Sequence, residues 1–234
     1  MKGYNSPMPR RTKEDAAVTR EQLLDAAERE FLEHGVTRTS LAEIAAAAGV
    51  TRGAVYWHFR DKSDLFSAMC ERATLPLESM LERSGGVVQE DALGTLRALA
   101  LYALTQLSTD PRARIVFEVL FHKCELAGEL APIAERRHHE RRVCLDQVER
   151  LMQQAVTAGQ LPPDTDTVLA TQALHAFMTG VMHEWVRDSA YDLSAVAPQL
   201  VDMMFAGLCA RPPRTTLDRC PHSSAATQPS GGGP

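Results

Sequence analysis

Hydrophobic and polar positions repeat with the period of an α-helix along most of the chain. Apolar residues recur three or four positions apart, in blocks that end at glycine, proline or a short polar residue. No segment of useful length shows the strict alternation of a half-buried strand, and no internal repeat is visible. The expected fold class is all-α, with helices over about residues 19–35, 40–49, 51–58, 61–83, 91–108, 111–126, 131–158, 164–187 and 194–210.

Two short helices around a tight turn are predicted between residues 40 and 62. Ser40 with Glu43 has the spacing of a capping box, in which each side chain satisfies the other's backbone N–H. Gly49 supplies the left-handed residue that ends the first helix, and Thr51 can cap the second. Thr19 with Gln22 has the same capping-box spacing at the start of the preceding helix.

The second short helix offers side chains suited to DNA. Arg52 can bond a guanine edge bidentately, the Thr51 methyl can touch a thymine methyl, and Gly53 lets the backbone approach a groove. The donors that follow suit phosphate oxygens, although Phe59 and its aromatic neighbours could instead form a packed cluster. For Phe59 alone we expect packing. The predicted helix-turn-helix contacts are Ser40, Thr51, Arg52, Gly53, Tyr56, Trp57, His58 and Lys62.

The segment from Thr19 to Met69 resembles the N-terminal domain of the TetR family of bacterial transcriptional repressors. The resemblance rests on TREQLLDAAEREFLEHG, TSLAEIAAAAGVTRGAVYWHF and DKSDLF. The later segments FEVLFHKCELAGEL, GQLPPDTDT and TGVMHEWV resemble the AcrR branch, whose members repress multidrug efflux operons and release DNA on binding lipophilic drugs. The resemblance implies a homodimer on a pseudo-palindromic operator, with one ligand cavity in each subunit.

Four regions are expected along the chain. A basic flexible arm spans 1–18, the helix-turn-helix domain 19–66, a helical ligand-binding and dimerisation domain 67–210, and a disordered tail 211–234. Residues 84–91 contain a glycine pair that should end the fourth helix. The resemblance implies that helices 164–187 and 194–210 form the dimer interface as a four-helix bundle.

Apolar stripes in the second domain are either filled core or cavity wall. Methionine suits a promiscuous pocket, and polar side chains on an apolar face need partners, so both features favour a cavity. The resemblance implies that this cavity is lined by Phe117, Phe121, Cys144, His175, Met178 and Thr179. Phenylalanine at 117 and 121 replaces polar residues common in similar repressors, which suggests a more apolar pocket.

Composition limits the alternatives. The net charge of −5 is compatible with DNA binding, because the first four charged residues are Lys2, Arg10, Arg11 and Lys13, so the basic charge gathers at the N-terminus. No run resembles a membrane span or a signal peptide, which predicts a cytoplasmic protein with no membrane partner. The five cysteines are widely spaced, so no disulfide framework is expected.

Nothing in the sequence nominates an enzyme, a metal or a cofactor. There is no Gly-rich phosphate loop, no H-E-x-x-H motif and no nucleophile with a base. His122 and Cys124 point apart on a helix, and the charged run 135–142 is either a second anion site or, as we prefer, a solvated helix face. The sequence predicts a ligand-released repressor of a multidrug efflux operon. The alternatives are a regulator of a metabolic operon that senses an endogenous molecule, and a helical enzyme or carrier.

Overall fold

The computed structural model describes residues 13–85, 90–124 and 131–214, and every regular element within these ranges is a helix, which confirms the all-α prediction. In chain order the helices are α1 (Lys13–His34), α2 (Leu41–Ala47), α3 (Arg52–His58), α4 (Lys62–Gly85), α5 (Ala92–Thr109), α6 (Pro111–Glu118), the π-helical turn η1 (Val119–Lys123), α7 (Ala131–Thr157), α8 (Thr167–Asp188) and α9 (Leu193–Ala210).

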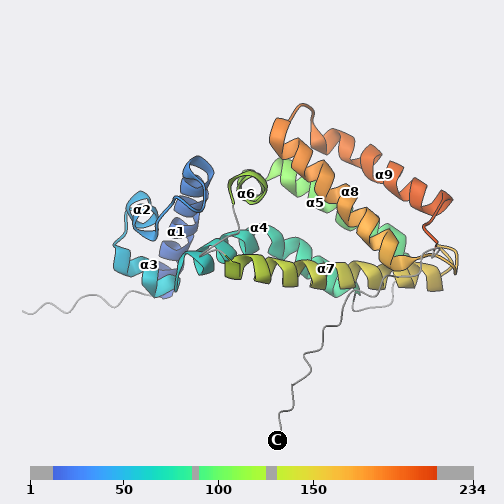
Figure 1. The fold of residues 1–234 in the computed structure, drawn as a ribbon, viewed down its shortest axis with the longest axis horizontal. Coiled ribbons are helices and arrows are strands. Elements are labelled where there is room, and N and C mark those ends of the chain that lie inside the picture. Colours follow the sequence, from blue (N-terminus) through green and yellow to red (C-terminus); the bar gives the residue numbers. More distant parts are fainter. Residues whose placement is uncertain (1–12, 86–89, 125–130, 215–234) are drawn as a thin grey trace, which may run out of the picture.

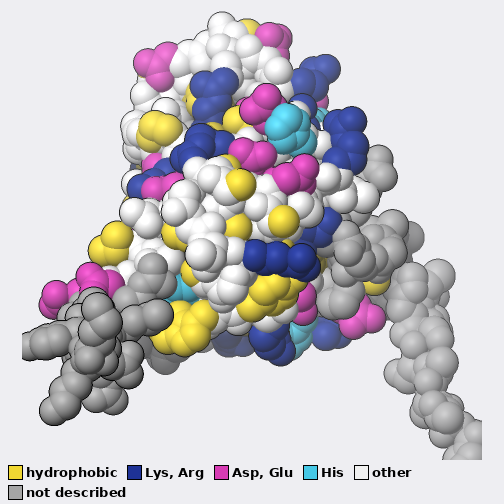
Figure 2. All heavy atoms as spheres, turned by 90° about the vertical axis from the view of Figure 1, so that its left-hand side faces the viewer, with side chains coloured by type: hydrophobic (Ala, Val, Ile, Leu, Met, Phe, Trp, Pro, Cys, Tyr) yellow, Lys and Arg dark blue, Asp and Glu magenta, His cyan; other side chains and the backbone are white. Residues whose placement is uncertain are grey.

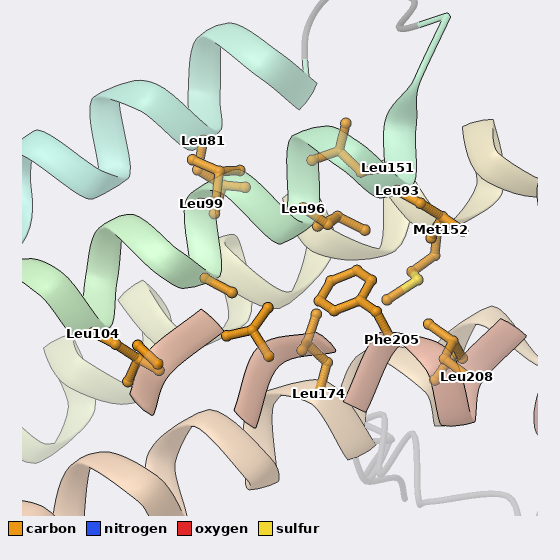
Figure 3. Close-up of a cluster of buried hydrophobic side chains, with 14 of the residues drawn as sticks. Leu81, Leu93, Leu96, Leu99, Leu104, Leu151, Met152, Leu174, Phe205 and Leu208 are labelled. Atoms are coloured by element: carbon orange, nitrogen blue, oxygen red, sulfur yellow. The ribbon is translucent and has the colours of Figure 1, made fainter. Parts of the chain in front are cut away.

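The helices gather at two ends of an elongated molecule (Figure 1). Helices α1–α3 form one end, α4 and α7 run along the length, and α5, α8 and α9 lie at the other end. The larger core packs leucines of α5 against α7, α8 and α9, including Leu96, Leu104, Leu151, Leu174 and Phe205 (Figure 3).

The smaller core belongs mainly to the N-terminal helices but does not stop at the predicted domain boundary. Phe31 of α1 packs on Phe66 of α4 with ring centroids 5.9 Å apart. The same cluster takes in three fully buried residues of α6, η1 and α7, namely Val116, Val119 and Ile133. The N-terminal domain therefore shares apolar contacts with the domain that follows it.

Aspartates fix the starts of several helices. Asp91, Asp110, Asp166 and Asp192 each accept a hydrogen bond from a backbone N–H in the first turn of the following helix. Such caps satisfy donors that the helix itself leaves unpaired. The predicted starts of α5, α6, α8 and α9 are thereby confirmed to within a few residues.

Two helix boundaries were predicted wrongly. Helix α1 begins at Lys13, and Thr19 is not its cap; the Thr19 hydroxyl donates instead to the carbonyl of Asp15, one turn earlier, at 2.9 Å. The helix predicted over 111–126 changes to a π-helical turn at Val119 and ends at Lys123. At the second of these places the buried Val119 holds the turn in the smaller core. Residues 14–18, which precede Thr19 in α1, are almost all exposed, so packing does not explain the earlier start of that helix.

The start of the predicted tail is also ordered. The N–H of Asp166 donates to the carbonyl of Pro213 at 2.8 Å, and the Arg214 guanidinium lies 3.2 Å from the Asp164 carboxylate. Residues 211–214 thus fold back on the start of α8, contrary to the expectation of disorder there. The remainder of the predicted tail, most of the basic arm and residues 86–89 of the predicted break lie outside the described residues.

Helix α9 combines a buried face with an uncovered apolar one. By length and composition alone it could cross a membrane, with a mean hydropathy of 1.5, so the expectation that no segment approaches a span was wrong for this helix. Leu193, Ala197, Val201, Phe205 and Leu208 are buried in the larger core, and 28% of the helix is buried in all. On the other face, Met203 is 63% exposed.

Candidate functional site

The turn between α2 and α3 has the geometry that its sequence predicts. Ser40 Oγ accepts the Glu43 N–H at 3.3 Å while the Ser40 N–H donates to Glu43 Oε2 at 2.7 Å, which confirms the capping box. These hydrogen bonds hold the pKa of Glu43 below its ordinary value. Gly49 adopts φ +69°, and Thr51 Oγ1 accepts the Ala54 N–H at 3.3 Å.

Helix α3 has one buried face and one exposed face. Val55 and Phe59 lie in the smaller core, so Phe59 packs as predicted. Trp57 is 72% exposed, and its ring meets His58 edge-on with centroids 4.6 Å apart. The end of the molecule formed by these helices faces the viewer in Figure 2, where Lys and Arg side chains lie among hydrophobic and acidic ones.

Arg52 and Tyr56 form a pair on the exposed face of α3. The Arg52 guanidinium donates to the Tyr56 hydroxyl at 3.3 Å and lies 5.6 Å from the ring centroid. The hydrogen bond raises the pKa of Arg52 further, so the group is a permanent cation. One turn of helix therefore presents a guanidinium and a phenol together to solvent.

Lys62 has a structural role that its sequence position does not reveal. Its ammonium donates to the carbonyls of Thr37 and Thr39, at 3.2 and 3.1 Å, and so ties the start of α4 to the α1–α2 connection. Asp61 caps α4 by accepting the Asp64 N–H at 2.8 Å. The predicted phosphate contact of Lys62 must be compatible with this structural role.

A hollow of about 550 Å³ lies between η1, α7 and α8. It brings together three residues predicted to bind ligand, Phe121, His175 and Thr179, and adds Arg141, Ala176, Gly180 and His183. The other three predicted residues, Phe117, Cys144 and Met178, are partly buried against the larger core rather than in the lining.

Polar groups in the hollow form a short chain. Arg141 Nε donates to His175 Nε2 at 3.4 Å, so Nδ1 carries the ring proton and donates to Thr179 Oγ1 at 3.1 Å. Burial, and secondarily the charge of Arg141, lower the pKa of His175. Arg141 and His183 were missed because one belongs to a run interpreted as solvated surface and the other stands alone.

The turn η1 contacts both the hollow and the N-terminal helices. Phe121 lines the hollow, Val119 is buried in the smaller core, and the carbonyl of Lys123 accepts the Val36 N–H at 3.1 Å. π-Helical turns occur frequently at functional positions. A displacement of Phe121 would therefore act directly on the connection between α1 and α2.

An ionic cluster makes a second connection between the domains. Arg72 of α4 pairs with Glu21, Asp25 and Glu28 of α1, and Arg112 of α6 lies 3.5 Å from Asp25. Burial raises the pKa of Glu28, although its pairing with Arg72 opposes this. The described cysteines are free, and no group of three or more His, Cys, Asp or Glu within the described ranges is placed to hold a metal.

Comparison with known proteins identifies the class. Residues 23–69 match the family model for bacterial regulatory proteins of the tetR family, and residues 91–209 match that for the C-terminal region of MAATS-type transcriptional repressors. The chain therefore belongs to the TetR family of transcriptional regulators. This membership agrees with the expectation that it is not an enzyme.

Individual relatives narrow the comparison. The chain is 37% identical over 201 residues to the HTH-type transcriptional regulator AcrR of Shigella flexneri, covering 84% of this chain and 92% of the relative. It is similar to NalD, the secondary repressor of the MexAB-OprM multidrug efflux pump in Pseudomonas aeruginosa (39% identity, TM-score 0.75, 83% of this chain and 98% of NalD). It is also similar to SmeT in the SmeT–triclosan complex (38% identity, TM-score 0.73, 81% of this chain and 91% of that chain). SmeT is the repressor of the Stenotrophomonas maltophilia multidrug efflux pump SmeDEF.

Proposed function

We propose that this protein represses a multidrug efflux operon and leaves its operator when a lipophilic molecule occupies the hollow. The observation that carries the proposal is the exposed pair of Arg52 and Tyr56 on a capped helix that is anchored in the smaller core by Val55 and Phe59. A rigid short helix with donors on one face suits the major groove. The similar proteins NalD and SmeT, both repressors of multidrug efflux pumps, support efflux control as the regulated process.

The contacts with DNA divide into two kinds. Arg52 bonds a guanine edge, and the Thr51 methyl contacts thymine, which together give sequence selection. A Cβ on Gly53 would meet only Thr51 Oγ1, at 3.9 Å, so glycine is there for the approach of DNA rather than for the fold. The phosphate contacts, which fix register, come from Ser40, Tyr56, Trp57, His58 and Lys62.

The protein acts as a cytoplasmic homodimer that pairs through α8 and α9. Leu169 is 49% exposed on α8 and Met203 is 63% exposed on α9, so both helices carry apolar surface that a second copy would cover. Two-fold pairing would present two copies of α3 to successive major grooves. A pseudo-palindromic operator matches that symmetry.

Release follows from a shift between two arrangements of the dimer. A ligand in the hollow contacts Phe121 of η1 and residues of α8, while η1 and α4 both connect to α1. A ligand that fits the released arrangement better displaces these connections and separates the two α3 helices. Its effect is limited by its differential affinity for the two arrangements.

The decisive experiment is a footprint of the purified protein on the DNA that flanks its own gene, repeated with triclosan and several unrelated lipophilic antibiotics. We expect a protected pseudo-palindrome and loss of protection with several drugs. The Arg52→Ala variant is the control for specific binding. Protection that only one endogenous metabolite removes would favour the metabolic regulator, and no protection would overturn the proposal.

A further inference from the structure

The lining of the hollow carries an unbalanced charge. Arg141 is a permanent cation, and the other lining side chains are aromatic, small or neutral polar groups, with no carboxylate among them. Glu184 lies beside His183 at 3.5 Å but is outside the lining and pairs with Arg187. An anionic ligand would therefore meet attraction in the hollow without an opposing acidic side chain.

Arg141 has unused hydrogen-bonding capacity. A guanidinium offers five N–H donors, and in the described part of the chain Arg141 spends one, Nε–H, on a long bond to His175. That bond orients the guanidinium from a fixed point, because His175 is itself held by Thr179. His175 is neutral and adds no charge, so Arg141 remains the principal anchor for a carboxylate, which a guanidinium can bind bidentately.

Phenylalanine and histidine rings lie beside Arg141 and form a wall of the hollow. Phe121 meets His183 edge-on with centroids 5.4 Å apart, His183 lies 4.9 Å from His122, and Phe117 backs Phe121 at 5.7 Å. Rings arranged in this way favour a planar aromatic partner through offset or edge contacts. The wall and the cation thus define two ends of one ligand.

We infer that the hollow selects aromatic acids, with the ring of the ligand against Phe121 and His183 and its carboxylate or phenolate on Arg141. This inference rests on the proposed function for its site, and it names the chemical class of inducer. A neutral drug of the same shape would keep the ring contacts and lose the ion pair. A cationic one would meet repulsion from Arg141.

Matched probes test the inference on the full-length protein. Calorimetric titrations with 1-naphthoate and with 1-naphthamide compare an acid with its neutral isostere on the same ring. We expect the acid to bind about tenfold more tightly, the size of a charge-assisted hydrogen bond. Equal affinities, or tighter binding of the amide, would overturn the inference.

Three variants locate the selectivity. Arg141→Gln should abolish the preference for the acid while the amide affinity stays within about twofold, and Arg141→Lys should keep part of it. Arg142→Gln, at the adjacent exposed position outside the lining, is the matched control and should keep all of it. Circular dichroism and thermal melting check that each variant folds.

Selectivity that persists in Arg141→Gln would place the acid elsewhere and overturn the inference. Drug-dependent loss of the footprint without any preference between acid and amide would reject this inference alone. A protein that binds the acid selectively but protects no DNA would instead reject the proposed function.

Discussion

The predicted DNA-binding residues all come from one short stretch, Ser40 to Lys62, whereas the hollow draws on η1, α7 and α8, which are far apart in sequence. The first surface lies mainly on α3, which Val55 and Phe59 anchor in the smaller core and which Thr51 caps. The second is partly open, and its residues are held by a few polar bonds. On the proposed function, DNA would meet a short capped helix, whereas a ligand would meet side chains from three separate elements that are held by a few polar bonds.

The largest loss of stability should come from removing Arg72, which connects α4 to α1, rather than from removing a residue of the DNA-binding surface or of the hollow alone. Arg72→Ala leaves Glu28 buried without its cation, and we expect a loss of about 3–5 kcal/mol in the free energy of unfolding, measured in urea. Arg112→Ala, whose side chain is 56% exposed, should cost about 1 kcal/mol or less. Similar losses in both variants would show that the buried Arg72–Glu28 pair contributes no more to stability than the exposed pairing of Arg112.

A second variant separates DNA recognition from folding. Arg52→Ala removes an exposed side chain, so stability should change little while operator affinity falls by about 1–3 kcal/mol, with base preference relaxed at one position in each half-site. Gel shifts on operator and random DNA measure the difference. Lys62→Ala should weaken both DNAs alike and also lower stability, because it removes the hydrogen bonds to Thr37 and Thr39. An equal loss for both DNAs in Arg52→Ala would refute the assignment of Arg52 to a base.

Substitutions at Met178 and Thr179 test which of the two residues belongs to the larger core and which to the lining of the hollow. Because it packs against the larger core, Met178→Trp should overpack it and cost about 1–3 kcal/mol, with drug release retained in the folded protein. Thr179→Trp, one residue further, should instead fill the hollow and block release. Thermal melts and drug-dependent gel shifts distinguish the two, and the reverse outcome would move the ligand site into the core.

The smallest expected effect concerns Gly53. Alanine is the better helix former and finds ordinary space there, so Gly53→Ala should raise the unfolding free energy by about 0.5–1 kcal/mol. The added methyl would nevertheless stand between α3 and DNA, and operator affinity should fall. A variant that gains stability and keeps full affinity would show that DNA does not approach this position closely.

The sequence predicted most where the physical cause is local. The Ser40 capping box and the Gly49 turn depend on residues about three apart, so their geometry follows from the pattern. The Thr19 signal has the same spacing and failed, because α1 extends past it to Lys13. Local patterns therefore predict the possibility of a cap, and the surrounding structure decides whether it is used.

The hollow was predicted only in part because its composition depends on which helices meet. Arg141 belongs to a charged run that satisfies every local criterion for solvated surface. It enters the lining only because α7 passes α8 near His175, and no spacing within either helix encodes that meeting. Phe117, Cys144 and Met178 pack against the larger core, as Phe121 also does, but only Phe121 of these four reaches the lining of the hollow.

The fold-back of residues 211–214 has a practical consequence for measuring these effects. The bonds to Asp164 and Asp166 fix where the chain leaves α9, at the end of the molecule away from α3 (Figure 1). An affinity handle attached after Arg214 would therefore immobilise the protein on a sensor surface with α3 facing the solution. A chain that ended before Pro213 would lack the bonds to Asp164 and Asp166, so the handle would no longer hold the protein in one orientation.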